Sequence, residues 1–317
     1  MKKICLFMLL AVLLCFSVCM TSCDDAQNSE GNPDESESEF AASNNQNQET
    51  ETAPNDDKTE SAASEEKSYL INGFDIRLIG DYPEIEAAIR ISANVENGEL
   101  TRDDFLRVTS LNLQNADIQD ITPVGALVNL TELNAASNRI IDISPLAGLE
   151  KLVKLSLMGN AIADLAPLAS LKNLTELQLH DNDIADISVL AELKNLTVLS
   201  LSCNHIVDVS PLTGLTELKY LQLMANEISD ISPLSSLTNL TDAILSSNQI
   251  SDISPLAGWK KIERLSLTSN PITDISVLRN LTTLLQVMVV NCPVEDFSPL
   301  DHVENVEPYT RGGTRPE

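Results

Sequence analysis

The feature that most constrains this chain is a repeat of 22 residues, which runs without insertion or deletion through nine copies starting at Val108. Its template, seen almost unaltered from Leu218 to Asn239, is L-x-x-L-x-L-x-x-N-x-I-x-D-I-S-P-L-x-x-L-x-N. Seven template positions require an apolar side chain, and all 63 such sites in the nine copies carry one. A period of this length indicates a solenoid, in which each copy buries its apolar face against its neighbours.

Each part of the template has a local structural meaning. Apolar residues in alternation, such as Leu221 and Leu223, predict a short strand. Nine such strands would form a parallel sheet about 40 Å across. Ser or Thr followed by Pro, as in Ser144-Pro145, predicts a hydroxyl-capped helical turn, of 3₁₀ type because few residues remain. The aspartate two residues earlier, Asp142 in that copy, is expected to accept hydrogen bonds from local backbone N–H groups.

Asparagine at the ninth template position is expected to turn the chain inward and to satisfy buried backbone groups of adjacent turns. The first and last copies carry Ala116 and Cys292 there instead, which suits end turns that have one neighbour. We therefore interpret Cys292 as a small apolar replacement, not a reactive thiol. The asparagines are Asn138, Asn160, Asn182, Asn204, Asn226, Asn248 and Asn270.

The N-terminus has the pattern of a secretion signal. Lys2 and Lys3 precede an apolar run over residues 4–20, and small residues lead up to Cys23. This predicts a signal peptide over residues 1–22. The sequence Met20-Thr21-Ser22-Cys23 resembles the lipobox of bacterial lipoproteins, which implies diacylation of Cys23 and stable membrane anchoring. We expect a lipid-anchored, extracytoplasmic protein on the bacterial surface. The alternative is an uncleaved anchor or an ordinary secreted form.

An acidic segment follows the signal. Residues 24–67 hold 14 acidic residues against Lys58 and Lys67, and Phe40 is the one large apolar residue among them. Such a composition cannot offset the entropy of ordering, so residues 23–67 are predicted to be a lipidated cysteine with a disordered tether. The net charge of −27 argues against a nucleic-acid partner, because phosphate binding needs clustered Lys and Arg.

The 22-residue period and the I-x-D-I-S-P-L signature resemble the internalin-type leucine-rich-repeat family, over about residues 68–303. This resemblance implies an α/β fold, a right-handed horseshoe with a parallel sheet on its concave face and 3₁₀ or turn segments on its convex face. It also implies a small helical N-terminal cap over 68–107, in which Thr101 should cap a helix. The repeats then occupy 108–303 and a tail occupies 304–317. No immunoglobulin-like domain or wall-sorting signal is recognised after 303, so host-cell invasion is not carried over.

The resemblance further implies that exposed strand positions on the concave face bind a partner. In each copy two of these positions are the fifth residue of the template (the middle row, Gln222 in the copy from Leu218) and the seventh (the outer row, Met224 in that copy). Along the nine copies both rows are mildly polar and carry few charges, which suits a protein partner. A plain solvated sheet face is the alternative. The expected partner-binding residues are Met158, His180, Val198, Tyr220, Met224 and Ile244.

Three further interpretations compete with protein binding. His180, Asp181 and Asp183 fall in register with Cys203 and His205 of the next turn, and these residue types suit zinc. We interpret that group as incidental loop surface and expect no metal, no cofactor and no enzyme activity.

A glycan-binding or envelope-scaffold lipoprotein is the alternative function. A glycan site would need several exposed aromatic platforms, and on this face only Tyr220 qualifies. We expect a monomer.

Overall fold

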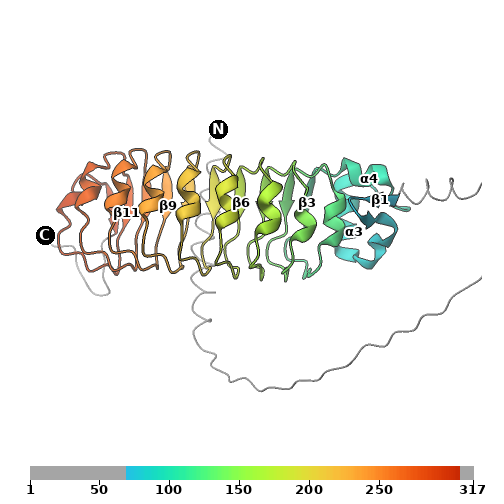
Figure 1. The fold of residues 1–317 in the computed structure, drawn as a ribbon, viewed down its shortest axis with the longest axis horizontal. Coiled ribbons are helices and arrows are strands. Elements are labelled where there is room, and N and C mark those ends of the chain that lie inside the picture. The colour runs from blue at the N-terminus through green and yellow to red at the C-terminus, as the bar shows by residue number, and fades with distance from the viewer. Residues whose placement is uncertain (1–68, 308–317) are drawn as a thin grey trace, which may run out of the picture. The chain divides into compact units, whose positions relative to one another are not determined.

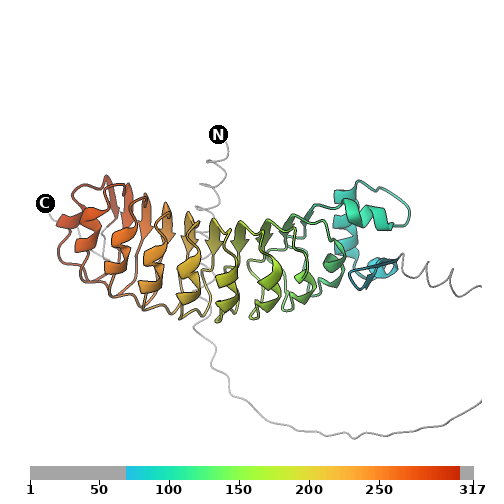
Figure 2. The same ribbon diagram turned by 45° about the horizontal axis from the view of Figure 1, so that its top comes forward.

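Each 22-residue repeat folds into one short strand and one 3₁₀ helix, and successive turns stack into a solenoid (Figure 1). The computed structural model describes residues 69–307. Ten strands form one parallel sheet along one side of the array, and the 3₁₀ helices lie along the other side. Figure 2 shows that the array curves towards the strands, so the sheet lies on the concave side. No helix within residues 69–307 is long and apolar enough to cross a membrane.

The strands of the sheet are three residues long, because the alternating part of the template is short. In chain order they are β3 (Ser110–Asn112), β4 (Glu132–Asn134), β5 (Lys154–Ser156), β6 (Glu176–Gln178), β7 (Val198–Ser200), β8 (Tyr220–Gln222), β9 (Asp242–Ile244), β10 (Arg264–Ser266), β11 (Gln286–Met288) and β12 (Asn305–Glu307). The predicted number of nine strands was one too small. Neighbours pair with an offset of 22 residues, as Ser110 pairs with Glu132, but Gln286 pairs with Asn305. The last turn is three residues shorter, which is why β12 does not fit the template.

The 3₁₀ helices confirm the predicted return segment. They are η3 (Thr122–Ala126), η4 (Ser144–Leu146), η5 (Ala166–Ser170), η6 (Ser188–Glu192), η7 (Ser210–Gly214), η8 (Ser232–Ser236), η9 (Ser254–Gly258), η10 (Ser276–Asn280) and η11 (Ser298–Leu300). The prediction of a hydroxyl cap was wrong. In η4 the Ser144 N–H donates to Asp142 Oδ1 at 2.7 Å, and the Ser144 hydroxyl donates to Asp142 Oδ2 at 2.9 Å. The aspartate therefore holds the start of the helix, as expected for that position, and the hydroxyl supports the aspartate.

The core is one continuous column of apolar side chains inside the solenoid. Of the 63 apolar template sites, 61 are buried, and the two exceptions are Val294 and Phe297 in the last turn. Trp259, the single tryptophan of the chain, is fully buried, and its Nε1 donates to the Leu234 carbonyl oxygen at 3.0 Å. Inside the repeats the core is therefore built mainly from many similar aliphatic contacts, and the large, fully buried aromatic side chains, Trp259 and Phe105, are few.

The asparagine column confirms the predicted ladder. The Asn204 amide donates to Leu201 O of its own turn at 3.0 Å and to Leu179 O of the preceding turn at 3.1 Å. Its Oδ1 accepts the Ile184 N–H at 3.0 Å. Each asparagine thus satisfies buried backbone groups on two turns at once, and the column fastens neighbouring turns to each other.

Cys292 takes the place of asparagine in the last copy, and the interpretation of it as a merely apolar replacement needs correction. The thiol is buried and donates to Leu267 O at 3.2 Å, so it keeps one of the hydrogen bonds of the ladder. Burial raises the pKa of the Cys292 thiol, which opposes thiolate formation and agrees with an unreactive group.

The N-terminal end of the solenoid is covered by additional structure. A two-stranded hairpin, β1 (Leu70–Ile71) and β2 (Phe74–Asp75), leads into η2 (Ile76–Asp81), α3 (Pro83–Ala93) and α4 (Arg102–Arg107). Thr101 caps α4 as expected, in a capping box with Asp104. Asn72 Nδ2 donates to the Gly125 carbonyl oxygen in η3 at 2.9 Å, which ties the hairpin to the first repeat. The first turn is thereby shielded from solvent.

Candidate functional site

Three rows of side chains cover the concave face, because alternate residues of each strand point away from the core. The first row begins each strand, the middle row ends it, and the outer row follows two residues later. In β8 these positions are Tyr220, Gln222 and Met224. The prediction of a face with few charges rests on the middle and outer rows alone. The first row reads Ser110, Glu132, Lys154, Glu176, Val198, Tyr220, Asp242, Arg264 and Gln286.

An uncharged pair lies at the centre of the first row. Val198 pairs in register with Tyr220 on the next strand, and both side chains are half-buried. Ile244 lies on β9, one strand further and one row over, opposite Gln222. Met224 follows β8 in the outer row, and both Met224 and Ile244 are half-buried. We call Val198, Tyr220, Ile244 and Met224 the apolar cluster.

The other two expected binding residues lie beside the apolar cluster. Met158 and His180 are half-buried and occupy the outer row on adjacent turns. Ser202, which is buried, occupies the same row on the turn between His180 and Met224. The fold therefore places all six predicted residues on one accessible face, in two groups of four and two.

A chain of hydrogen bonds links three adjacent turns and ends at Tyr220 of the apolar cluster. Gln222 Nε2 donates to the Tyr220 hydroxyl oxygen, and Gln222 Oε1 accepts from the Ser200 hydroxyl at 2.7 Å. Ser200 Oγ lies 3.3 Å from His180 Nδ1. Because Ser200 gives its one proton to Gln222, its oxygen can only accept from His180, which requires a proton on Nδ1. Because Gln222 is itself buried, its hydrogen bond restrains the Tyr220 hydroxyl.

His180 is the titratable member of this network. Burial lowers its pKa, and the nearby Asp181 carboxylate opposes this shift. The imidazole is therefore neutral over a wider pH range than an exposed histidine, and one proton on Nδ1 fits the hydrogen bond to Ser200.

Ion pairs flank the apolar cluster on both sides of the first row. Lys154 Nζ lies 3.5 Å from Glu132 Oε1 and 3.9 Å from Glu176 Oε2. On the other side Arg264 Nε pairs with Asp242, whose carboxylate also accepts from the Thr241 hydroxyl at 2.8 Å. The concave face therefore carries more charges than predicted, and those of the first row are paired between neighbouring turns. An uncharged centre with a charged rim is the usual arrangement of a protein interface.

The five residues considered for zinc do not converge. Across residues 69–307 no group of three or more His, Cys, Asp and Glu side chains could hold a metal ion. The His180 ring contacts Ser200, whereas His205 Nδ1 lies 3.8 Å from Glu227 Oε1, so the two imidazoles have different partners. Asp181 and Cys203 occupy the turn position that has positive φ in the repeats, at 59° and 53°, so their backbone serves the turn. Asp183 is exposed.

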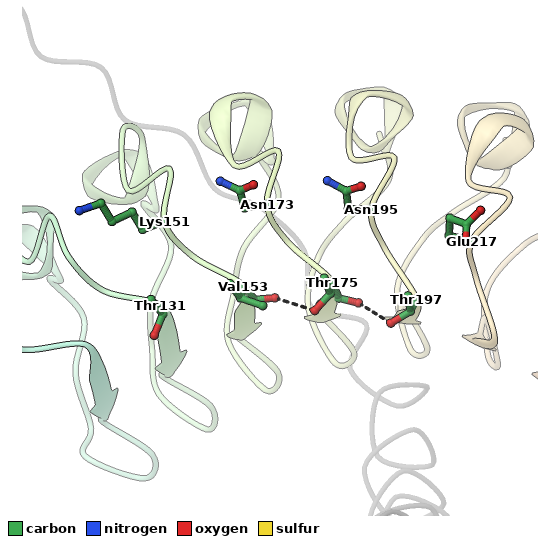
Figure 3. Close-up of a pocket in the computed structure, with 8 residues that line it drawn as sticks. All are labelled: Thr131, Lys151, Val153, Asn173, Thr175, Asn195, Thr197 and Glu217. Carbon is green, nitrogen blue, oxygen red and sulfur yellow. Dashed lines mark hydrogen bonds between the residues drawn. The ribbon is translucent and has the colours of Figure 1, made fainter.

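A shallow groove runs along one rim of the solenoid, between the ends of the 3₁₀ segments and the starts of the strands (Figure 3). Asn173 Nδ2 donates to Glu150 O at 2.8 Å, and the Thr175 hydroxyl donates to Val153 O at 3.3 Å. Both acceptors belong to the preceding turn. The recurring N-L-T triplets therefore have a structural explanation in a second ladder at the rim. The groove is lined by Thr131, Lys151, Val153, Asn173, Thr175, Asn195, Thr197 and Glu217.

Comparison with known proteins agrees with this architecture. The family described as "Leucine Rich repeats (2 copies)" matches residues 150–192, 194–236 and 238–280. The crystal structure of an internalin, inlF, from Listeria monocytogenes is 35% identical with a TM-score of 0.69, covering 71% of this chain and 68% of that one. Internalin C2 from the same organism is 30% identical with a TM-score of 0.57, covering 72% of this chain and 92% of that one. The chain belongs to the internalin-type leucine-rich-repeat family.

A more distant likeness and one negative result complete the comparison. A leucine-rich-repeat protein from Leptospira interrogans is 23% identical with a TM-score of 0.58, covering 64% of this chain and 62% of that one, and shares the fold. Comparison with curated protein sequences finds no match. Leucine-rich-repeat domains mediate protein–protein interaction, and proteins of this family are generally non-catalytic binding scaffolds. The concave face of this internalin-type protein is accordingly its candidate binding surface.

Proposed function

We propose that this internalin-type protein is a cell-surface lipoprotein that binds a protein partner through its concave face. The observation that carries this proposal is the apolar cluster, which lies half-exposed among paired charges. Side chains at such a site lose water on binding while the charged rim keeps its own partners. The buried Gln222 supports Tyr220, so little freedom of that side chain remains to be lost when a partner docks.

The chemistry of the face favours a protein over a glycan. Glycan sites stack sugar rings on aromatic platforms, and Tyr220 is the one aromatic residue in the three rows. Aliphatic and thioether side chains such as Ile244 and Met224 suit the apolar side chains of a protein. Adhesion to another cell is the form of binding that a surface position would serve.

The anchor is proposed from the sequence of residues 1–23, which lie outside the described residues. A lipid on Cys23 and the acidic segment that follows would hold the solenoid away from the membrane. Growth of cells that express the chain with radiolabelled palmitate tests this. Label on the native protein and none on the Cys23→Ala variant would support the anchor, and an unlabelled native protein would reject it.

Protein binding is tested by capture against surface proteins and, in a parallel arm, against cell-wall fragments. The native solenoid should retain a protein that the Tyr220→Ala, Met224→Ala double variant loses. A matched control is Thr268→Ala, in the outer row two turns away from Met224. Equal affinity of the double variant and the native protein would remove the apolar cluster from consideration. Retention of wall fragments alone would favour the glycan-binding alternative.

A further inference from the structure

The two ends of the solenoid differ in how their cores are closed. At the N-terminal end the hairpin, η2, α3 and α4 cover the first turn, and Val108, Leu111 and Leu113 are buried. At the C-terminal end β12 pairs with β11 on one side, and within residues 69–307 no strand pairs with its other edge. Solenoids require such terminal turns to be covered, because each turn otherwise leaves one apolar face in water.

The apolar side chains at this end are the ones that depart from the pattern of the core. Val294 and Phe297 are half-buried, whereas the residues 22 positions earlier, Ile272 and Ile275, are 0% and 1% exposed. Val306 is also half-buried, and it pairs in register with Val287, which is 0% exposed. Val294, Phe297 and Val306 therefore form an apolar end face with no covering turn among the described residues.

The last turn is rich in acidic side chains, and the base beside it, Arg279 of the preceding turn, donates from Nη2 to the Ser298 hydroxyl oxygen at 3.1 Å. From residue 280 to residue 307 the chain has five acidic residues and no lysine or arginine. Elsewhere in the solenoid an acidic residue often pairs with a base on an adjacent turn, as Asp117 does with Arg139 and Asp242 with Arg264. Glu295, Asp301 and Glu304 are exposed, and each has no ion pair among the described residues.

The segment that follows β12 has the complementary chemistry. Residues 308–317 read PYTRGGTRPE and contain one aromatic residue, Tyr309, and two bases, Arg311 and Arg315. Pro308 lacks an N–H group and so cannot continue the ladder of β12. Four residues span at most about 14 Å and eight about 28 Å, enough to cross a layer about 10 Å thick. A second copy of the solenoid fits less well, because two acidic end faces would repel each other.

We propose that residues 308–317 cover the C-terminal end face, with Tyr309 against Val294, Phe297 and Val306. Arg311 and Arg315 pair with the surrounding carboxylates. The two arginines would thus replace the bases that a following turn supplies elsewhere in the solenoid, as Arg139 does for Asp117.

Amide hydrogen exchange of the full chain at Asn305 and Val306 tests this proposal. A stop after Glu307 and the Arg311→Glu, Arg315→Glu double variant should each speed exchange at both amides at least tenfold. The matched Arg311→Lys, Arg315→Lys variant keeps the charges and should leave exchange unchanged. Fluorescence of Trp259, two turns inside the solenoid, checks that every variant is folded.

A charge exchange sharpens the test. Adding Asp301→Arg and Glu304→Arg to the Arg311→Glu, Arg315→Glu variant should restore slow exchange. Unchanged exchange after the stop at Glu307 would overturn the proposal. Protection that rises with protein concentration, together with a doubled mass in analytical ultracentrifugation, would also overturn it, because a second copy would then cover the face.

Discussion

The Cys292 thiol donates to the carbonyl oxygen of Leu267, the residue 25 positions upstream, and Asn270 one turn earlier donates to Leu245 across the same separation. Cysteine thus retains the donor half of the ladder. Cysteine lacks the acceptor half. In the preceding turn that half is Asn270 Oδ1, which accepts the Ile250 N–H at 3.0 Å. The corresponding N–H at the end of the ladder belongs to Ile272.

Cys292→Asn is therefore expected to stabilise the protein. The new Oδ1 can accept the Ile272 N–H, and the free energy of unfolding should rise by about 1 kcal/mol. Cys292→Ala loses the remaining hydrogen bond and should lower it. Urea unfolding followed by Trp259 fluorescence measures both. Equal stability of the asparagine and alanine variants would show that the ladder ends at Asn270.

Asn204→Ala should cost much more than substitution of an asparagine at the rim. Asn204 is buried and serves backbone groups on two turns, so its loss leaves donors and acceptors unsatisfied and should lower stability by about 3 kcal/mol. Asn195 is exposed and makes one such bond, to Lys172 O at 2.8 Å. Asn195→Ala is the matched control and should cost less than about 1 kcal/mol. Similar losses in the two variants would contradict the different roles of the two columns.

Tyr220→Ala should weaken binding of a captured partner by about 2 kcal/mol, or roughly 30-fold in Kd. Gln222→Met preserves side-chain volume but removes the bond that holds Tyr220, so a smaller loss of affinity is expected. Surface plasmon resonance with the immobilised solenoid measures both values. A Gln222→Met variant with native affinity would show that the tyrosine needs no support.

The pKa of Asp230 is lowered by hydrogen bonds from the Ser232 backbone N–H and then from the Ser232 hydroxyl. A carboxyl with a lower pKa in the folded state stabilises the fold above its ordinary pKa of 3.8, and this contribution disappears as pH falls. Asp186, Asp274 and Asp296 shift in the same direction for the same reason. Replacing all four with Asn should flatten the fall of Tm between pH 5 and pH 2, as measured by calorimetry. A fall as steep as that of the native protein would contradict this.

Gly125→Ala should destabilise the junction between cap and repeats. A Cβ at this position would meet the Pro145 carbonyl oxygen at 2.9 Å, so backbone must move, at a cost of about 1–3 kcal/mol. Gly214 provides the control, because a Cβ there meets the flexible end of Lys194. Thermal unfolding should separate the two variants, and equal Tm values would mean that the stacking of η3 on η4 adapts freely.

The periodicity of the chain was sufficient to predict the repeated part of the fold. Each apolar site, each ladder asparagine and each capping aspartate recurs at the same template position. An irregular residue in one copy therefore does not obscure the structure that the other copies predict. The departures occur where the register is lost. The last turn is shorter, so β12 was missed, and the hairpin at Leu70–Asp75 has no counterpart elsewhere in the chain to reveal it.

The candidate site could be predicted only in part, because it depends on differences between copies. Val198 and Tyr220 were recognised as large side chains on adjacent turns. The link from His180 through Ser200 to Gln222 depends on side-chain rotamers, which no spacing encodes. The ion pair of Asp242 with Arg264 was missed because only Val198 and Tyr220 of the first row entered the prediction, and its charged members did not.

The constant offset of 22 residues between paired strands has a consequence for how this protein can change. Every internal turn presents the same backbone hydrogen-bonding groups to its two neighbours. If a whole repeat is lost or duplicated, the turns that become neighbours can therefore pair in the same register. The concave face can then lengthen or shorten in increments of about 4.8 Å while the remaining turns keep their stacking. A change in the number of units is thus a route by which the concave face could vary in length while each remaining turn keeps its fold.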